Sequence, residues 1–229
     1  MKLTILGKFG PYPQDGNSAC SGYLIESDTK KLLIDCGSGV LGRLQDTINV
    51  NDLDAIYLTH LHYDHTSDML PMGYLLDTLN KDVKVYTNLT NNPYEKILFS
   101  NKHYIVNNIS ESTNVVIGDL KLSFFKMDHP VINHGVLIEC CGVKLGITGD
   151  TRMCPNVINL AKCSDYLLAD CSKPVDFKGP HMNVNDAQTI LANTDVVIFA
   201  THSTPNNDIS ITNNKNIIPV EEFKTYTLT

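Results

Sequence analysis

The sequence has no run of about 18 apolar residues, the length that a helix needs to cross a membrane. Its first residues, Met1 to Gly7, are soon followed by further glycine and proline, so they do not resemble a secretory signal peptide. Charged residues make up only 19% of the chain and hydrophobic residues 42%, which is typical of a globular protein rather than a disordered one. We therefore expect no membrane association and a cytoplasmic location.

Basic residues are the scarcer of the two charge types. There are 18 lysines and arginines against 25 aspartates and glutamates, which gives a formal net charge of −7. An acidic surface repels phosphate backbones, so nucleic acid is not favoured as a partner, although a local basic patch would still allow it. No low-complexity linker or long charge run divides the 229 residues, and we expect a single domain spanning 1–229.

Cys-x-x-Cys motifs are also lacking, although the chain contains seven cysteines. An odd number of cysteines without such a motif indicates free thiols in a reducing compartment, most of them serving as small core residues. The more informative residues are the eight histidines, because several of them stand close together in one short segment.

Short apolar runs bounded by turn residues predict strands, and apolar residues at helical spacing predict helices. The predicted helices cover 40–48, 69–79, 93–99 and 183–192, the last with Asn183 as its N-cap. Each half of the chain opens with hairpins and continues with strand–helix alternation, which predicts an α/β fold of two packed sheets with helices outside. The predicted strands cover 3–6, 22–26, 31–35, 53–58, 83–86, 115–117, 120–126, 136–140, 143–147, 166–169 and 196–200.

A histidine-rich motif follows the predicted strand 53–58 and places four polar side chains close together: His60, His62, Asp64 and His65. Alternation in an extended segment puts His60 and His62 on the same face. Neutral imidazole and carboxylate are ligands for Zn²⁺, Mn²⁺ or iron rather than for Cu(I) or Ca²⁺. The motif therefore predicts a metal site; the alternative is a polar loop with solvent-facing histidines.

Three further candidate ligands, His129, Asp150 and His202, each follow a predicted strand, where α/β sheets usually present their chemistry. With these the chain has enough ligands for two cations. We expect His60, His62 and His129 on one, and Asp64, His65 and His202 on the other. A bridging Asp150 would hold the two ions together. The remaining positive charge suits a hydroxide and an anionic substrate.

These residues, in this order, resemble the hydrolases of the metallo-β-lactamase fold, and the resemblance extends from the Gly37–Gly39 turn to His202. It implies an αββα four-layer sandwich with two divalent metal ions, Zn²⁺ in the first place and Mn²⁺ as the alternative. Asp35, which ends the predicted strand 31–35, is a candidate to hydrogen-bond the metal-binding loop. His134 is a candidate either for a structural role or for substrate contact.

A narrower resemblance links residues 172–191 to ribonuclease Z and its phosphodiesterase relatives. In that branch a histidine assists phosphate chemistry, and the position that matches it here is His181. Asp170 falls where the branch often has a carboxylate that orients a histidine. The resemblance implies hydrolysis of a small or cyclic phosphodiester, with Asp64 as ligand and base and His181 as the catalytic histidine.

Several alternatives stay open. The segment between His129 and Asp150 has room for one hairpin but not for the arm with which ribonuclease Z grips tRNA, which disfavours tRNA maturation. A ribonuclease acting on RNA 3′ ends, a lactonase or a thioesterase could use the same dinuclear scaffold. A non-enzymatic binding module would be expected to lack a ligand, and none is missing. Relatives of this kind are often homodimers.

Overall fold

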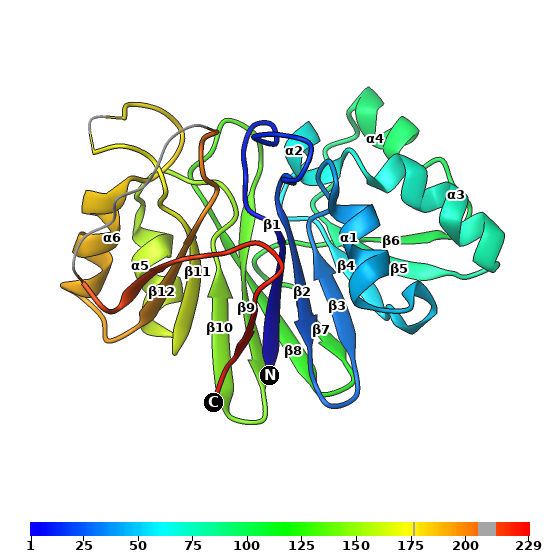
Figure 1. The fold of residues 1–229 in the computed structure, drawn as a ribbon. Helices are drawn as coiled ribbons and strands as arrows, with labels where there is room; N and C mark the ends of the chain where they lie inside the picture. The colour runs from blue at the N-terminus through cyan, green and yellow to red at the C-terminus, as the bar shows by residue number, and fades with distance from the viewer. Residues whose placement is uncertain (176, 206–213) are drawn as a thin grey trace.

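Two sheets pack face to face, with helices covering both outer faces, in the order helix, sheet, sheet, helix (Figure 1). The computed structural model describes residues 1–175, 177–205 and 214–229. Over these residues each sheet has seven strands, in the orders β14-β1-β2-β3-β4-β5-β6 and β13-β12-β11-β10-β9-β8-β7. The predicted fold class, an α/β four-layer sandwich of the metallo-β-lactamase type, is confirmed.

The first sheet consists of β1 (Lys2–Gly7), β2 (Gly22–Glu26), β3 (Lys31–Ile34), β4 (Ala55–Tyr57), β5 (Val83–Thr87), β6 (Tyr104–Asn108) and β14 (Thr225–Thr227). The helices on its side are α1 (Val40–Thr47), α2 (Tyr63–Thr66), α3 (Met69–Leu79) and α4 (Pro93–Leu98), together with a 3₁₀ turn at Val50–Asp52.

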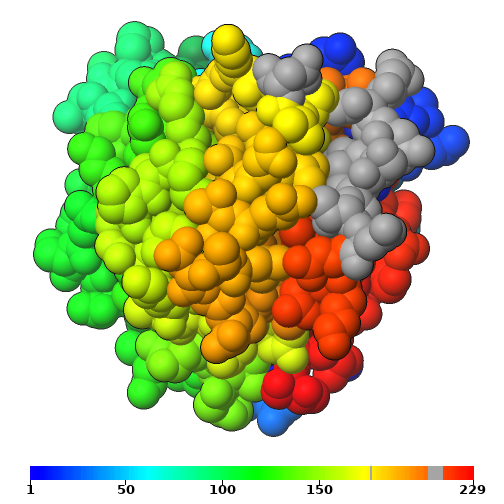
Figure 2. All heavy atoms as spheres, turned by 90° about the vertical axis from the view of Figure 1, so that its left-hand side faces the viewer, coloured from blue at the N-terminus to red at the C-terminus, as the bar shows by residue number. Residues whose placement is uncertain are grey.

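The second sheet consists of β7 (Asn114–Ile117), β8 (Leu120–Lys126), β9 (His134–Cys140), β10 (Val143–Ile147), β11 (Tyr166–Asp170), β12 (Val197–Thr201) and β13 (Ile217–Pro219). The helices α5 (Pro155–Lys162) and α6 (Val184–Leu191) lie outside it. Figure 2 views the molecule from this side and shows the residues of both helices covering much of the face.

Strand direction changes in the same way in both sheets. The strands β1, β2 and β3 pair antiparallel, and β3 to β6 pair parallel. In the second sheet β7 to β10 pair antiparallel, and β10 to β13 pair parallel. Because parallel strands end at the same edge, the loops that follow β4, β10 and β12 can meet there.

Three apolar cores hold the layers together. The central core lies between the sheets and includes Ile5, Ile34, Val136, Ile138 and Leu168, all fully buried or nearly so. One outer core joins the first sheet to α1 and α3, and the other joins the second sheet to α5 and α6. Burying one such side chain contributes about 1.5–3 kcal/mol, so the alternating apolar residues of the strands supply most of the packing energy.

The structure adds elements that the sequence patterns did not predict: α2, α5, β6, β13 and β14. It confirms the cap of α6, where the Asn183 side chain accepts from the backbone N–H of Asp186, and Asp186 accepts in return from the N–H of Asn183. Among the residues described, there is no helix with the length and apolar character needed to cross a membrane.

Candidate metal centre

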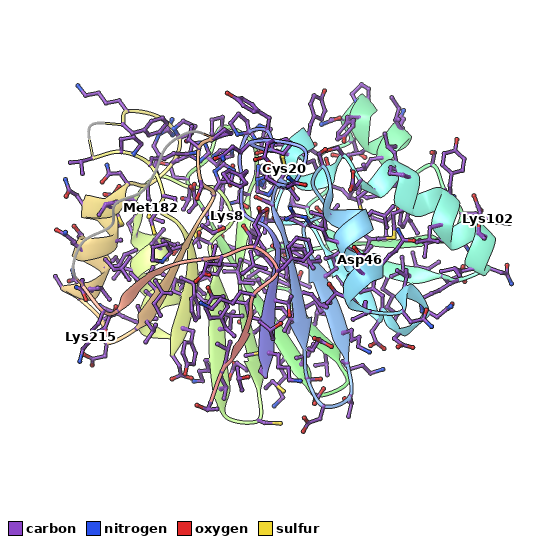
Figure 3. The ribbon with its side chains drawn as sticks, in the orientation of Figure 1. Lys8, Cys20, Asp46, Lys102, Met182 and Lys215 are labelled. Atoms are coloured by element: carbon purple, nitrogen blue, oxygen red, sulfur yellow. The ribbon has the colours of Figure 1, made fainter. Side chains whose placement is uncertain are left out.

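All seven predicted ligands meet at the edge of the sheets where the parallel strands end. His60 and His62 follow β4, and Asp64 and His65 lie in α2. The second sheet supplies the others from the loops after β8, β10 and β12, namely His129, Asp150 and His202. The site lies at the upper edge in Figure 3, close to the labelled Cys20; a Cβ added to Gly37 would meet both the Cys20 Cβ and the backbone carbonyl oxygen of Asp64.

The first group of ligand atoms consists of three imidazole nitrogens. His62 Nδ1 lies 3.0 Å from His60 Nε2 and 3.2 Å from His129 Nε2. The Oδ2 atom of Asp150 completes this group, at 3.7 Å from His60 Nε2 and 3.9 Å from His129 Nε2. The expectation that His60 and His62 share one face agrees with these contacts.

The second group adds a carboxylate and two further imidazoles. His202 Nε2 lies 3.3 Å from Asp64 Oδ2, and His65 Nε2 lies 3.7 Å from the same oxygen. Both of these nitrogens are 3.2 Å from Asp150 Oδ1. Asp150 therefore turns one oxygen to each group, which is the arrangement of a carboxylate that bridges two cations.

For His65 and His129, hydrogen bonds indicate which ring nitrogen carries the proton. His65 Nδ1 lies 2.7 Å from Asp35 Oδ2, and His129 Nδ1 lies 3.2 Å from the carbonyl oxygen of Pro180. A neutral imidazole that donates from Nδ1 has a free lone pair on Nε2, which is the atom these residues present to the centre. Asp35 also accepts from the backbone N–H and hydroxyl of Thr59, beside His60, as expected for a residue that supports the loop.

Burial keeps the imidazoles of the first group neutral. It lowers the pKa of His60 well below its ordinary value, lowers the pKa of His62, and lowers the pKa of His129 to about 4. Metal binding requires the neutral form of histidine. The protonation state of these three residues therefore suits a cation.

In the second group, the charges of neighbouring residues outweigh the effect of burial on the pKa values. Burial acts to lower the pKa of His65, but the charges of Asp150, Asp35 and Asp64 outweigh it and raise that pKa well above its ordinary value. Burial likewise acts against ionisation of Asp64, yet the neighbouring His65 and His202 lower its pKa to about 2. Ionised carboxylates around a buried imidazole create a strongly negative site that a cation would neutralise.

The donor set and its spacing fit divalent metal ions. Zinc bonds to nitrogen and oxygen of about 2.0–2.1 Å place neighbouring tetrahedral ligands ~3.3 Å apart, and the contacts given above lie close to that value. His65 Nε2 is buried and makes no hydrogen bond, an arrangement that a metal ligand explains. The histidine and aspartate groups could thus hold divalent cations.

His181 lies at the edge of the same site. Its Nδ1 is 2.7 Å from Asp170 Oδ2, and its ring stacks on that of His202 with centroids 4.8 Å apart. Asp170 Oδ1 faces His202 Nδ1 at 3.6 Å, so one buried carboxylate lies between the two histidines. Burial raises the pKa of Asp170 to about 8, which favours retention of a proton between Asp170 and His181.

Two neighbours of His202 were not predicted. His202 has a φ of 60°, an uncommon left-handed conformation for a residue with a side chain, and Lys173 Nζ donates to its carbonyl oxygen at 3.1 Å. A Cβ on Gly10 would lie 2.1 Å from His202 Nε2, so only glycine fits there. Lone lysine and glycine residues carry no sequence signal for such contacts.

His134, left open between two roles, occupies a structural position. It begins β9 and is buried, its backbone N–H donates to Thr59 O at 3.1 Å, and its carbonyl oxygen accepts from the Tyr57 hydroxyl. His134 therefore supports β4 and the residue that follows it, from which the histidine motif continues.

Comparison with known proteins gives a consistent result at the level of the family. The model of a family described as "Beta-lactamase superfamily domain" matches residues 30–202. The "Probable metallo-hydrolase YhfI" of Bacillus subtilis is 29% identical over 200 residues, covering 83% of this chain and 81% of its own. A ribonuclease Z of Methanopyrus kandleri is 30% identical over 131 residues, covering 56% of this chain and 47% of its own.

Solved structures share the whole fold. The crystal structure of YhfI from Bacillus subtilis has a TM-score of 0.89 at 24% identity and covers 98% of both chains. The short form of human tRNase Z has a TM-score of 0.82 at 17% identity over 100% of both chains. A diphosphatase of the PhnP family has a TM-score of 0.77 at 18% identity, covering 99% of this chain and 97% of its own.

Proposed function

The chain belongs to the β-lactamase superfamily of metal-dependent hydrolases, and from that premise we propose that it is a dinuclear phosphodiesterase acting on small or cyclic phosphodiesters. The observation that carries the proposal is the position of Asp150. Its two oxygens face two separate ligand groups at 3.2–3.9 Å, and His181 lies beside both.

In this proposal His60, His62 and His129 would hold the first cation, Asp64, His65 and His202 would hold the second, and Asp150 would be shared between them. The mixed nitrogen and oxygen donors favour Zn²⁺, with Mn²⁺ as the alternative. Two such ions, when bound, would supply Lewis acidity for the phosphoryl oxygens and a hydroxide nucleophile at neutral pH. The lowered pKa of Asp64 keeps its carboxylate ionised, which suits a metal ligand better than it suits a proton acceptor. We therefore assign Asp64 to metal binding.

The proton for the leaving oxygen comes from His181. Asp170 accepts from His181 Nδ1, which fixes the ring and leaves Nε2 free for a substrate atom. Burial lowers the pKa of His181 and raises that of Asp170, so the two groups together hold the proton between Nδ1 and Oδ2, and His181 can donate its Nε2 proton as the bond to phosphorus breaks. A positioned general acid of this kind contributes about 10²–10⁴ in rate.

Two observations support a phosphodiester as the substrate class. Similar proteins include a ribonuclease Z and, by fold, a tRNase Z and a diphosphatase of the PhnP family. The centre also unites His181 with the ligands, as the resemblance of residues 172–191 implies. The chain between His129 and Asp150 forms the β9–β10 hairpin and has no room for an arm that grips tRNA. We therefore propose a small substrate in preference to RNA. All seven cysteines are free, which supports the proposal of a reducing, cytoplasmic setting.

The test is turnover of bis(p-nitrophenyl) phosphate by the His181→Ala protein, loaded with metal and analysed for its metal content. We expect kcat to fall by about 10²–10⁴ while the bound metal stays at the wild-type level. Asp170→Asn serves as the companion variant and should lower kcat in the same direction. Unchanged turnover in His181→Ala would remove this residue from the mechanism.

A panel of substrates tests the bond that is cleaved. The wild-type protein should hydrolyse 2′,3′-cyclic nucleotides and bis(p-nitrophenyl) phosphate faster than lactones, thioesters or RNA 3′ extensions. Faster turnover of a lactone or thioester would replace the phosphodiesterase proposal with the corresponding alternative on the same scaffold.

A further inference from the structure

A second group of metal-binding side chains lies at the opposite end of the sheets. The hairpins β2–β3, β7–β8 and β9–β10 turn at the lower end in Figure 1, whereas the histidine-rich centre lies at the upper edge. Cys140 ends β9, Cys141 follows it in the turn, and Asp119 lies in the turn between β7 and β8. One ligand atom from each lies within 4.8 Å of the other two.

The backbone of the β9–β10 turn is unusual for its sequence. Cys141 has a φ of 52° and Gly142 a φ of 86°, so both residues of this two-residue turn are left-handed. Asparagine or aspartate is the usual residue at the first of these positions, and a cysteine there costs conformational energy. An outlier of this kind is a reason to look for a function at the site.

The consequence of this turn is that two neighbouring side chains point the same way. Successive residues of a regular strand point to opposite faces. Here the Sγ atoms of Cys140 and Cys141 are only 3.7 Å apart. Two thiolates bound to one zinc ion at about 2.3 Å, with a tetrahedral angle between them, would be separated by ~3.8 Å.

The carboxylate of Asp119 is held in place for a ligand. Its Oδ1 accepts hydrogen bonds from the hydroxyls of Ser27, at 2.6 Å, and Thr29, at 2.7 Å, both in the β2–β3 turn. Its Oδ2 is left to face Cys140 Sγ at 3.8 Å. The two hydroxyls lower the pKa of Asp119, so the carboxylate is ionised.

We propose that Asp119, Cys140 and Cys141 form a site for one thiophilic divalent cation, preferentially Zn²⁺, separate from the histidine-rich centre. Two thiolates and one carboxylate provide three ligands, and water completes the tetrahedron. Each thiol releases its proton to solvent as its bond to the cation forms, without any change of oxidation state. Burial raises the pKa of Cys140 to about 11, so this thiol stays protonated until a cation binds.

Such a cation would join the two sheets. Asp119 belongs to a turn of the second sheet but is hydrogen-bonded to the β2–β3 turn of the first. The strand β9 separates Cys140 from His134, next to the histidine motif, by about 20 Å at the usual rise per residue. The site is therefore positioned to stabilise the sandwich and is too remote to take part in hydrolysis.

The test is titration of the reduced, full-length protein with Co²⁺, read as the sulfur-to-cobalt charge-transfer absorption in the near ultraviolet. The histidine-rich centre offers nitrogen and oxygen ligands, so this absorption reports the cysteine site alone. We expect one equivalent of Co²⁺ beyond the two that the histidine-rich centre would take to complete it, and excess Zn²⁺ to remove it. Cys141→Ser should at least halve the absorption, because one of the two thiolates is lost, and Asp119→Asn should weaken Co²⁺ binding by at least about 10-fold.

Cys163→Ser is the matched control, because Cys163 is also an exposed, free cysteine but lies outside any group of ligands in the described chain. It should keep the full absorption, and Cys141→Ser should keep wild-type hydrolase turnover. Zn²⁺ should also slow alkylation of Cys141 and leave that of Cys163 unchanged. A wild-type protein without the absorption, or an absorption unchanged in Cys141→Ser, would overturn the proposal.

Discussion

Three buried carboxylates, Asp35, Asp150 and Asp170, organise the histidines of the centre. Asp35 and Asp170 each accept a hydrogen bond from the Nδ1 of one histidine, and Asp150 faces the ligand nitrogens directly. The sequence could identify these residues because each follows or ends an apolar strand. It could not assign protons to particular nitrogens, since that depends on contacts between residues far apart in the chain.

Asp35→Asn tests the orienting role of one carboxylate. Asp35 has a φ of 57°, which asparagine tolerates, so the backbone should keep its shape. The hydrogen bond from His65 Nδ1 to an ionised oxygen is lost, and metal affinity should fall by about 10–100-fold. Competition with a chromophoric chelator measures this, with Asp46→Asn on the exposed side of α1 as the control. Equal affinities in the two variants would show that Asp35 does not support the ligands.

The elements differ in how clearly the sequence indicates them. The hairpins and α6 were predicted because alternation, turn residues and the Asn183 cap agree with one another. The helix α5 was missed although Pro155 stands at its first turn and Val157, Leu160 and Ala161 are buried, because Cys154 at its start is not a capping residue and makes no side-chain cap hydrogen bond. The strands β13 and β14 have three residues each, and they exist through pairing with the distant β12 and β1.

Asn183→Ala tests the cap of α6. Loss of the side-chain acceptor leaves the first N–H groups of the helix unpaired, and the free energy of unfolding should fall by about 1 kcal/mol. Urea denaturation provides the value, and Asn183→Thr, which keeps an acceptor, should lose much less. A free energy of unfolding in Asn183→Ala equal to that of the wild type would mean that packing alone fixes the N-terminal end of α6.

Gly10→Ala tests the contact between the loop after β1 and the loop after β12. An added Cβ would displace the His202 ring, so metal affinity should fall by about 10–100-fold, the range for groups that orient a ligand. Gly16→Ala is the matched control, because a Cβ there meets nothing within 4 Å. The same chelator competition applies to both variants. Wild-type affinity in Gly10→Ala would show that His202 is not needed as a ligand.

At the scale of the whole molecule, each sheet supplies part of the centre. The first contributes the histidine motif after β4, and the second contributes His129, Asp150 and His202. Strand ends and residue types predicted which groups could meet, and the order of the motifs matched a known family. The sequence could not show that the two sheets bring these loops to the same edge, because that follows from their packing. That residues 1–229 form one domain stays a prediction.

The most direct measurement is the anomalous scattering of zinc-loaded crystals on either side of the zinc absorption edge. We expect two peaks about 3.5–4 Å apart on either side of the Asp150 carboxylate, one among His60, His62 and His129 and one among Asp64, His65 and His202. A single peak, or none within bonding distance of Asp150, would contradict the dinuclear centre on which the proposed hydrolysis depends.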